Sequence, residues 1–166
     1  MSGEKDPRRT VTLHPIGVIH SCHQRTEETP IQPVYAQGAR GRAEVFPEYA
    51  DGLRDLEGFS HLFLIYWFDK ASAPQLIVKP FLDDALRGVF ATRAPCRPNP
   101  IGLSIVRLVE RDGNVLHLAD LDVLDETPLL DIKPYIARFD RYDDTRSGWQ
   151  EQIDEETARR LGRRQA

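Results

Sequence analysis

Apolar and polar positions alternate over several short stretches of this chain, and the pattern predicts strands more often than helices. "VTLHPIGVIHS" (11–21) is a predicted strand with a bend at Pro15 and Gly17, and "SHLFLIYWFDK" (60–70) is a predicted buried strand. "EVFPEYADGLRDLEGF" (44–59) predicts a short strand followed by helical turns that end at its last glycine. "ETPLLDIKPYIARFD" (126–140) is expected to be extended.

The strongest local signal is a hairpin over 101–125. Two apolar runs flank Asp112 and Gly113 in "IGLSIVRLVERDGNVLHLADLDVLD", and Asp-Gly between alternating apolar runs is typical of a tight hairpin turn. "SGWQEQIDEETARRLGRR" (147–164) predicts a C-terminal helix, acidic early and basic late. Strands with few helices between them favour a mainly β fold, an antiparallel sheet or barrel, over a doubly wound parallel sheet.

Two segments have no regular period. Residues 21–43 are rich in turn formers and basic groups, and they predict either an ordered functional loop or a disordered one. Residues 71–87 carry Pro74 and Pro80, which interrupt any regular element, so we assign no element there.

Composition narrows the class of protein. A chain of 166 residues with 40% hydrophobic residues is long enough for one domain with a core. The net charge of −4 gives no overall attraction to nucleic acid, so any such binding must use a local basic patch. The two cysteines form no disulfide framework, and the longest apolar run, "LFLIYWF", is too short to span a membrane. We therefore expect a cytoplasmic protein that binds no membrane and is not exported.

Familiar catalytic and metal-binding motifs are absent from the sequence. No GxGxxG, GxxxxGK, HExxH, GxSxG or CxxC occurs, which argues against a Rossmann or P-loop enzyme. The cluster of His20, Cys22 and His23 contains metal-ligating residue types, but it has no partner cluster elsewhere, so no metal site is predicted. Asp120, Asp122 and Asp125 are either a cation site or a solvated strand end, and we favour the strand end.

The stretch "TRAPCRPNP" (92–100) predicts a binding edge. Its prolines favour an extended, non-helical backbone, in which Arg93, Arg97 and Asn99 would point the same way. Guanidinium and carboxamide groups bind phosphate, carboxylate or base edges through forked hydrogen bonds. The alternative is a proline-stiffened turn with exposed arginines.

A second polar face is predicted in "LLDIKPY". If this segment is extended, Asp131, Lys133 and Tyr135 lie on one face and the intervening apolar residues on the other. A carboxylate, an ammonium and a phenol would then be neighbours. On its own this pattern is more typical of a surface ion pair.

Together, these segments resemble a known family. "LEGFSHLFLIYWF", "GVFATRAPCRPNPIGLSIVRL" and "LDVLDETPLLDIKPYI", preceded by "IGVIHS" and "IQPV", are similar to the TsaA-like (TrmO) family from about residue 14 to about residue 140. The resemblance implies a single-sheeted β-barrel, usually a homodimer that holds S-adenosylmethionine at the subunit interface. It implies N6-methylation of threonylcarbamoyladenosine at position 37 of tRNA, so the expected partner is a tRNA anticodon loop and not DNA.

The resemblance also implies roles for particular residues. Expected cofactor contacts are Gln32, Pro33, Asp69, Lys70, Arg93, Leu103, Thr127, Pro128, Leu129 and Leu130. The chain departs from the family pattern at Val34, Asp69 and Glu126, and Glu126 stands where the usual motif has glycine.

Roles in catalysis and substrate binding are a hypothesis from the chemistry of the residues. Asp131, or a water that it holds, is expected to accept the amine proton, Tyr135 to orient the base, and Asn99 to take part in catalysis. Arg97 and Lys133 are expected to bind phosphate or the threonylcarbamoyl carboxylate, with Arg40 and Arg42 as further RNA contacts.

The expected organisation is a flexible N-terminus over 1–10, a barrel domain over 11–145 and a C-terminal helix and tail over 146–166. Two alternatives stay open at this stage: methylation of another nucleobase or a small amine, and a nonenzymatic protein that binds S-adenosylmethionine.

Overall fold

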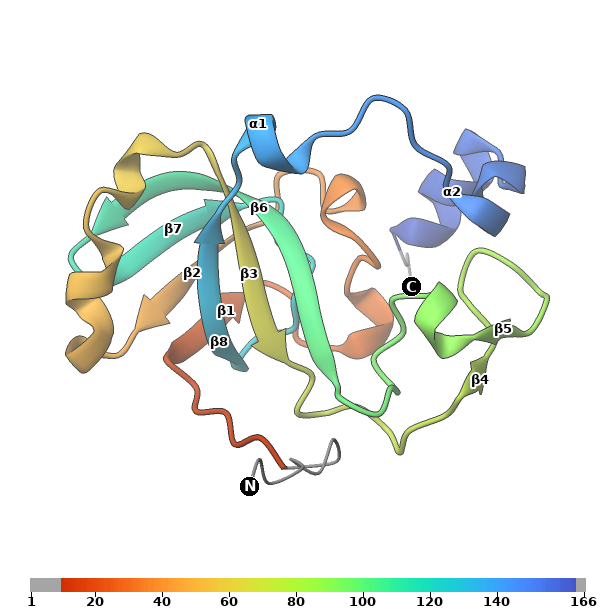
Figure 1. Ribbon diagram of the computed structural model, residues 1–166, viewed down its shortest axis with the longest axis horizontal. Helices are drawn as coiled ribbons and strands as arrows, with labels where there is room; N and C mark the ends of the chain where they lie inside the picture. Colours follow the sequence, from red (N-terminus) through yellow and green to blue (C-terminus); the bar gives the residue numbers. More distant parts are fainter. Residues whose placement is uncertain (1–9, 164–166) are drawn as a thin grey trace, which may run out of the picture.

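Six strands of the computed structural model, which describes residues 10–163, form one closed antiparallel barrel (Figure 1). The strands are β1 (Gly17–Ser21), β2 (Arg40–Val45), β3 (His61–Trp67), β6 (Ile101–Asp112), β7 (Val115–Ala119) and β8 (Thr127–Pro134). Their order around the barrel is β1-β2-β7-β6-β3-β8, and β8 pairs with β1 to close it. The mainly β barrel fold predicted from the sequence is confirmed.

Short elements surround the barrel. The 3-10 turns are η1 (Thr26–Glu28), η2 (Pro33–Tyr35), η3 (Pro47–Leu53), η4 (Leu56–Gly58), η5 (Val89–Ala91) and η6 (Gly148–Gln152). A small separate sheet pairs β4 (Ile77–Val78) with β5 (Arg87–Gly88), and the α-helices are α1 (Ala137–Asp140) and α2 (Glu155–Gly162). No helix within residues 10–163 is long and apolar enough to cross a membrane.

The core lies inside the barrel, and strand β3 shows why. Its residues alternate between buried and partly exposed positions, so that Leu62, Leu64 and Tyr66 point inward. They pack with inward residues of the other strands, among them Ile19, Val106, Leu116 and Leu129. An alternation of inward and outward side chains along each strand of a sheet that closes on itself is enough to build this core.

The predicted hairpin is confirmed as β6 and β7. Asp112 pairs with Val115, so Gly113 and Asn114 form the two-residue turn. Gly113 has a φ of 59°, a left-handed conformation that glycine adopts without strain. The second strand ends at Ala119, several residues before the predicted end.

Strand β8 contains one extra residue relative to its partner β3. Tyr66 pairs with Leu129 and the preceding Ile65 pairs with Asp131, which leaves Leu130 as a β-bulge. Before the bulge Thr127 and Leu129 point into the barrel. After it the inward position passes to Ile132, which packs against the core, and Asp131 lies on the outer side.

Several predicted boundaries were wrong. The extended stretch 126–140 ends at Pro134 and is followed by α1, while the C-terminal helix is split into η6 and α2. The split falls at Asp154, whose carboxylate caps α2 by accepting a 2.8 Å hydrogen bond from the Thr157 backbone N–H. Residues 21–43 contain η1 and η2, and their last four residues belong to β2.

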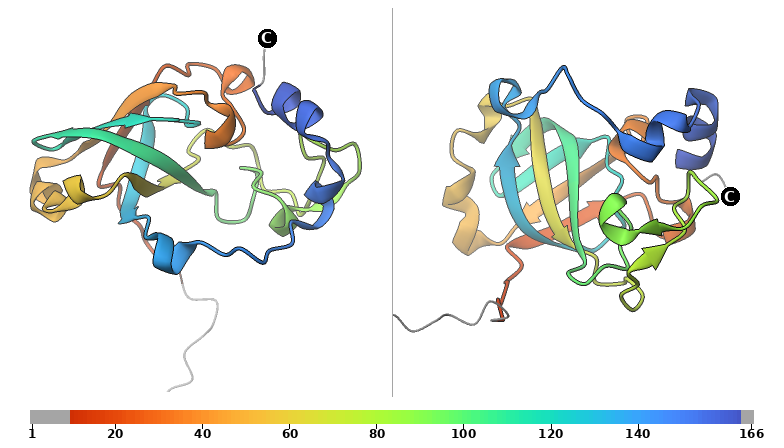
Figure 2. Two further views of the ribbon diagram at one scale, coloured as in Figure 1. Left: turned by 90° about the horizontal axis from the view of Figure 1, so that it is seen from above. Right: turned by 45° about the vertical axis from the view of Figure 1, so that its right-hand side comes forward.

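The chain after α1 crosses from the barrel to the side that carries β4 and β5. Figure 1 and both views of Figure 2 show this blue segment running to η6 and α2, which lie beside the green β4–β5 region. The predicted flexible N-terminus falls on residues outside the described range, apart from Thr10, and so do the last three residues.

Candidate cofactor and substrate site

A large cavity of about 1050 Å³ lies between the barrel and the loops beside it. Its wall contains residues from η2, the ends of β3 and β6, the loop before β6, the β7–β8 connection and η6. Many of the residues expected from the sequence line it, namely Gln32, Pro33, Asp69, Lys70, Arg93, Arg97, Asn99, Leu103 and Thr127. The fold therefore brings together segments that are up to about one hundred residues apart in the chain.

Arg93 joins two of these segments. Its Nη1 donates a hydrogen bond to the side-chain oxygen of Gln32, which stands immediately before η2. The Gln32 amide in turn donates a 2.6 Å hydrogen bond to the carbonyl of Ile31. A charged guanidinium is thereby held at the cavity wall by a fixed partner.

Arg97 makes hydrogen bonds within its own loop. Residues 93–99 form a series of bends and not an extended ribbon, so the predicted common face of Arg93, Arg97 and Asn99 does not form through strand alternation. The Arg97 guanidinium donates to the carbonyls of Thr92 and Ala94, at 3.2 and 3.4 Å, and so closes its own loop. Arg97 and Asn99 still line the cavity.

Three buried polar groups form a chain at the inner wall of the cavity. The Ser104 hydroxyl donates a 2.6 Å hydrogen bond to Asp122 Oδ1 and lies 2.9 Å from the Tyr66 hydroxyl. Burial raises the pKa of Asp122 to about 6, against the opposing effects of the Ser104 hydrogen bond and the Arg93 charge. Burial also raises the pKa of Tyr66, helped by the nearby Asp122 carboxylate. Asp122 and Tyr66 both line the cavity, so they offer it a carboxylate and a phenol.

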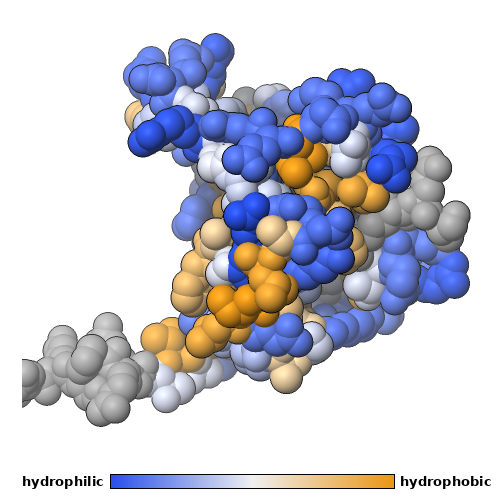
Figure 3. Space-filling view, turned by 90° about the vertical axis from the view of Figure 1, so that its right-hand side faces the viewer, coloured by the Kyte–Doolittle hydropathy of each residue, from blue (hydrophilic) through white to orange (hydrophobic). Residues whose placement is uncertain are grey.

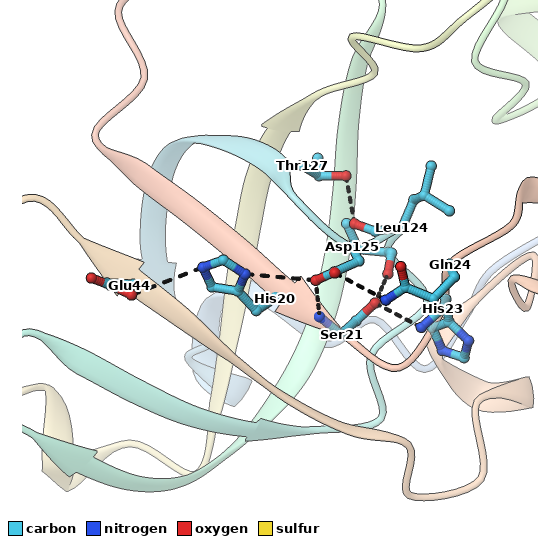
Figure 4. A network of polar contacts seen from close by, with 9 residues as sticks. His20, Ser21, His23, Gln24, Glu44, Leu124, Asp125 and Thr127 are labelled. Carbon is cyan, nitrogen blue, oxygen red and sulfur yellow. Dashed lines mark hydrogen bonds and ion pairs between the residues drawn. The ribbon is translucent and has the colours of Figure 1, made fainter.

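The β7–β8 connection that carries Asp122 is held by a polar network (Figure 4). Asp125 accepts hydrogen bonds of 2.9 Å from the Ser21 backbone N–H and from the Gln24 side chain, and the Ser21 hydroxyl donates to the carbonyl of Val123 at 2.6 Å. Burial works to raise the pKa of Asp125, but the hydrogen bonds from Gln24 and Ser21 outweigh it and lower the pKa. These hydrogen bonds hold the residues that follow Asp122 in the chain.

The histidines of the predicted His20–Cys22–His23 cluster belong to the same network. His20 lies between two carboxylates, 3.6 Å from Asp125 Oδ1 and 3.9 Å from Glu44 Oε2. The His23 imidazole is 2.8 Å from the carbonyl of Leu121. Both rings therefore support the β7–β8 connection.

The rim of the cavity is apolar. Val34, Phe81 and Leu103 line it while exposing 78%, 60% and 48% of their surface. On the face that carries β4 and β5, apolar residues gather between hydrophilic ones (Figure 3). An exposed apolar area of this kind is typical of a surface that binds a ligand or partner.

Some predicted site residues lie away from the cavity. Asp131 and Lys133 form a 2.9 Å ion pair on the outer side of β8, and the Tyr135 ring lies 5.7 Å from that of Phe63. The side chain of Leu129 is fully buried in the barrel core. Pro128, Leu130, Arg40 and Arg42 are also absent from the cavity wall, and both arginines are exposed on β2.

The outer side of β3 and β6 is also apolar. Trp67 pairs with Ile101, Ile65 with Leu103 and Phe63 with Ile105, and these residues point away from the core. Trp67, Ile101, Leu103 and Ile105 are each at least 40% exposed. We call these six residues the outer apolar face. It adjoins the Asp131–Lys133 pair on one side, because Ile65 pairs with Asp131.

The sequence did not reveal three residues of the site. Asp122 was predicted to be at a solvated strand end, but it is 9% exposed at the cavity wall. Tyr66 and Trp149 carried no signal beyond their place in an apolar strand and in the predicted C-terminal helix. The acidic spacing of Asp120, Asp122 and Asp125 was the available hint, but it did not single out Asp122, whose neighbours Leu121 and Val123 are also buried.

A closed antiparallel barrel with a mixed polar and apolar cavity at its edge defines a β-barrel ligand-binding domain. A family model described as the tRNA-methyltransferase O N-terminal domain matches residues 18–141, and the chain belongs to this family. The resemblance inferred from the sequence motifs is thereby confirmed.

Known relatives agree with this assignment. A probable S-adenosyl-L-methionine-binding protein of Pyrococcus abyssi is 52% identical over 85% of this chain and 77% of its own length. A human tRNA (adenine(37)-N6)-methyltransferase is 38% identical over 76% of this chain and 30% of its own length. The crystal structure of TrmO from Pseudomonas aeruginosa superimposes with a TM-score of 0.72 at 40% identity, over 85% of this chain and 63% of that one.

The similarity covers different shares of these proteins. The chain spans most of the Pyrococcus protein, under two thirds of the Pseudomonas chain and about a third of the human enzyme.

Proposed function

We propose that this chain is an S-adenosylmethionine-dependent methyltransferase that methylates N6 of an adenine in tRNA. One observation carries the proposal: residues of the family motifs from η2, the end of β3, the loop before β6 and the start of β8 line one cavity. The names of the family and of the human relative support the same reaction class.

The cavity has the chemistry that the cofactor requires. S-adenosylmethionine combines a planar adenine with a sulfonium and the charged ends of an amino acid. Apolar side chains such as Leu103 suit the adenine, Asp122 complements positive charge, and Arg93 complements a carboxylate. Gln32 and Asp69 add hydrogen-bonding groups at the wall. The residues present therefore fit the group.

When bound, this cofactor supplies an electrophilic methyl group. An exocyclic adenine amine is a weak nucleophile, because its lone pair is conjugated with the ring. The protein must therefore orient the amine and accept its proton. We propose that Asp131 accepts the proton, that Tyr135 and Asn99 orient the base, and that Arg97 and Lys133 bind phosphate or a carboxylate of the substrate.

The specific substrate that we propose is threonylcarbamoyladenosine at position 37, in the anticodon loop. Unstacked loop bases can enter a protein pocket, where they stack on aromatic groups. Arg40 and Arg42 on β2 are further candidates for contacts with the RNA backbone. Because the proposed substrate is tRNA, the location that we propose is the cytoplasm.

We propose further that the chain is a homodimer joined through the outer apolar face. This face is continuous with the cavity, because Ile101, Leu103 and Ile105 belong to both. It also adjoins the Asp131–Lys133 pair, which lies outside the chain's own cavity. In a twofold dimer the same patch meets itself, so Asp131 of one subunit would serve the cavity of the other.

A second candidate is a protein that binds the cofactor without catalysis. The Pyrococcus abyssi relative, which matches this chain over most of its length, is named a probable S-adenosyl-L-methionine-binding protein.

One experiment tests these alternatives. The protein is incubated with methyl-labelled S-adenosylmethionine and tRNA from cells that lack it, and the nucleosides are analysed by mass spectrometry. Methylated threonylcarbamoyladenosine is expected with the wild type and not with Arg93→Ala. Cofactor binding without labelled RNA would favour the second candidate, and label on another nucleoside would refute the proposed substrate.

A further inference from the structure

The C-terminal segment contributes to the cavity although it lies outside the matched family domain. The family match ends at residue 141, yet Ser147, Trp149 and Gln150 line the cavity. These residues belong to η6 and the turn before it, beside β5 (Figures 1 and 2). One wall of the site is thus made by chain beyond the domain that defines the family.

Trp149 is held in place from two sides. Its indole N–H donates a 2.9 Å hydrogen bond to the carbonyl of Ala91, and the Arg87 guanidinium lies 5.5 Å from the centre of its ring. Arg87 is itself fixed by Asp83, with hydrogen bonds of 2.5 and 3.0 Å. A large aromatic ring in this position has little freedom to turn.

The far end of the segment is anchored as well. The backbone N–H of Ile31 donates a 3.0 Å hydrogen bond to the carbonyl of Gly162, the last residue of α2. Gly162 is pressed against the ring of Tyr35, because a Cβ at this position would lie 2.4 Å from that ring. Ile31 and Tyr35 both line the cavity, so α2 is attached to the opposite wall.

The other aromatic rings of the cavity are differently placed. Tyr66 is buried and hydrogen-bonded to Ser104, and its ring packs edge-on against that of Phe68 at 5.3 Å. Tyr35 packs against Gly162. Phe81 is 60% exposed at the cavity rim, whereas Trp149 is partly buried, carries the larger ring system and is fixed by Ala91 and Arg87.

We propose that Trp149 is a stacking surface for an adenine ring and that the segment from Ser147 to Gly162 is part of the binding site. The proposal rests on the proposed function, in which the methyl donor and the methyl acceptor each contain an adenine. Stacking on an aromatic side chain suits either ring, since both are planar π-systems.

The test measures two ligands separately. Affinity for S-adenosylhomocysteine is measured by calorimetry, and kcat/KM for tRNA is measured at saturating cofactor. The variants are Trp149→Ala, Trp149→Phe and a chain that ends at Arg146. The matched controls are Gln152→Ala, an exposed residue of the same turn, and a chain that ends at Arg163.

Trp149→Ala is expected to lower either the affinity for S-adenosylhomocysteine or the kcat/KM for tRNA by about tenfold, the usual effect of losing one stacked base. A loss of S-adenosylhomocysteine affinity identifies the cofactor adenine as the ring on Trp149, and a loss of kcat/KM alone identifies the RNA adenine. Trp149→Phe should retain most of the wild-type value, and the controls should equal it. The chain that ends at Arg146 should show the same loss as Trp149→Ala or a greater one.

Tryptophan fluorescence gives a direct signal that does not depend on activity. The sequence contains two tryptophans, so Trp67→Phe leaves Trp149 as the single emitter. Quenching by S-adenosylhomocysteine or by an anticodon stem-loop supports stacking.

The measurements separate a failure of the proposed function from a failure of the stacking role of Trp149. A wild-type protein that binds neither ligand overturns the proposed function, and the role of Trp149 with it. A wild type that binds, together with a Trp149→Ala variant unchanged in both measurements, overturns the stacking role alone.

Discussion

Ser104 on β6 donates a 2.6 Å hydrogen bond to the carboxylate of Asp122, three residues beyond the end of β7. The contact joins a strand of the barrel to the connection that forms one wall of the cavity. It places an acid with a pKa of about 6 where a cationic cofactor is proposed to bind.

Cofactor affinity is predicted to depend on pH through Asp122. A cation favours the ionised carboxylate, so the Kd for S-adenosylmethionine should fall as the pH rises from 5 to 7, through the pKa of about 6. Asp122→Asn should bind more weakly and with little change over this range. Calorimetry at several pH values measures both. A wild-type Kd as flat as that of the variant would contradict the role of Asp122.

The same carboxyl group should affect stability in the opposite direction. Its folded pKa of about 6 lies above the ordinary value of 3.8, so the folded state holds the proton more tightly. Stability contributed by this group is therefore present below pH 4 and is lost as the pH rises to 6. Asp122→Asn should reduce this loss, as measured by urea unfolding at pH 4.5 and pH 7.

Asp131→Asn tests the proposed proton acceptor. The variant keeps the shape of the side chain but removes its charge, so turnover should fall by about 100-fold or more. Cofactor affinity should be unchanged, since the proposed role of Asp131 is to accept the proton of the substrate amine and not to hold the cofactor. Asp143→Asn, which alters an exposed carboxylate paired with Arg141, is the matched control. Normal turnover of Asp131→Asn would remove this residue from the mechanism.

The outer apolar face predicts the oligomeric state. Ile105→Glu places a charge at the Phe63–Ile105 end of this face, and the protein should change from dimer to monomer in analytical ultracentrifugation. Val109→Glu is the control, because Val109 is similarly exposed on the same strand but lies beyond the face. A wild type that sediments as a monomer would refute the dimer.

Mixed subunits extend this test. Asp131→Asn and Arg93→Ala subunits, each inactive alone, should recover part of the activity when combined, if each site uses both chains. No recovery in verified heterodimers would assign each site to a single chain.

Gly102 is predicted to be irreplaceable for steric reasons. A Cβ at this position would lie 2.1 Å from the ring of Tyr66, so Gly102→Ala must displace a core residue that also lines the cavity. The expected loss is about 1–3 kcal/mol in the free energy of unfolding. Gly88→Ala is the control, since nothing lies within 4 Å of its added Cβ. Equal stability of the two variants would contradict the contact.

Glu126 is a position where a substitution should stabilise the protein. Its φ of 64° is in the left-handed region, which glycine adopts without strain. Glu126→Gly should raise the free energy of unfolding by about 1 kcal/mol, and Glu126→Ala should not, because alanine keeps the backbone strain. Thermal unfolding compares the three proteins, and a gain in the alanine variant would point to a cause other than the backbone.

The sequence predicted the regular parts of the fold well. Strand β3 and the β6–β7 hairpin follow from a period of two and a turn at Gly113. The irregular parts were harder to predict, because they show no regular alternation of apolar and polar residues. Asp122 follows a residue with positive φ, Asp120, so strand alternation does not apply to it.

The site was predictable in part, for a similar reason. Motif residues such as Gln32 and Arg93 line the cavity together. Trp149 could not be foreseen, since its place depends on long-range contacts with Ala91 and Arg87. The bent backbone of residues 93–99 was missed because proline allows turns as readily as extended chain.

The bulge at Leu130 has a consequence for comparing this protein with its relatives. It shifts the alternation of side chains by one residue. The side chains that follow it therefore lie on the opposite side of the barrel wall from the side that strict alternation would give. A relative with one residue fewer at this point would need no bulge, and its counterparts of Asp131 and Lys133 would still lie on the outer side of β8. The bulge therefore lets β8 hold an extra residue without turning these two charges toward the core, so a one-residue gap here does not separate proteins that display the charges from proteins that bury them.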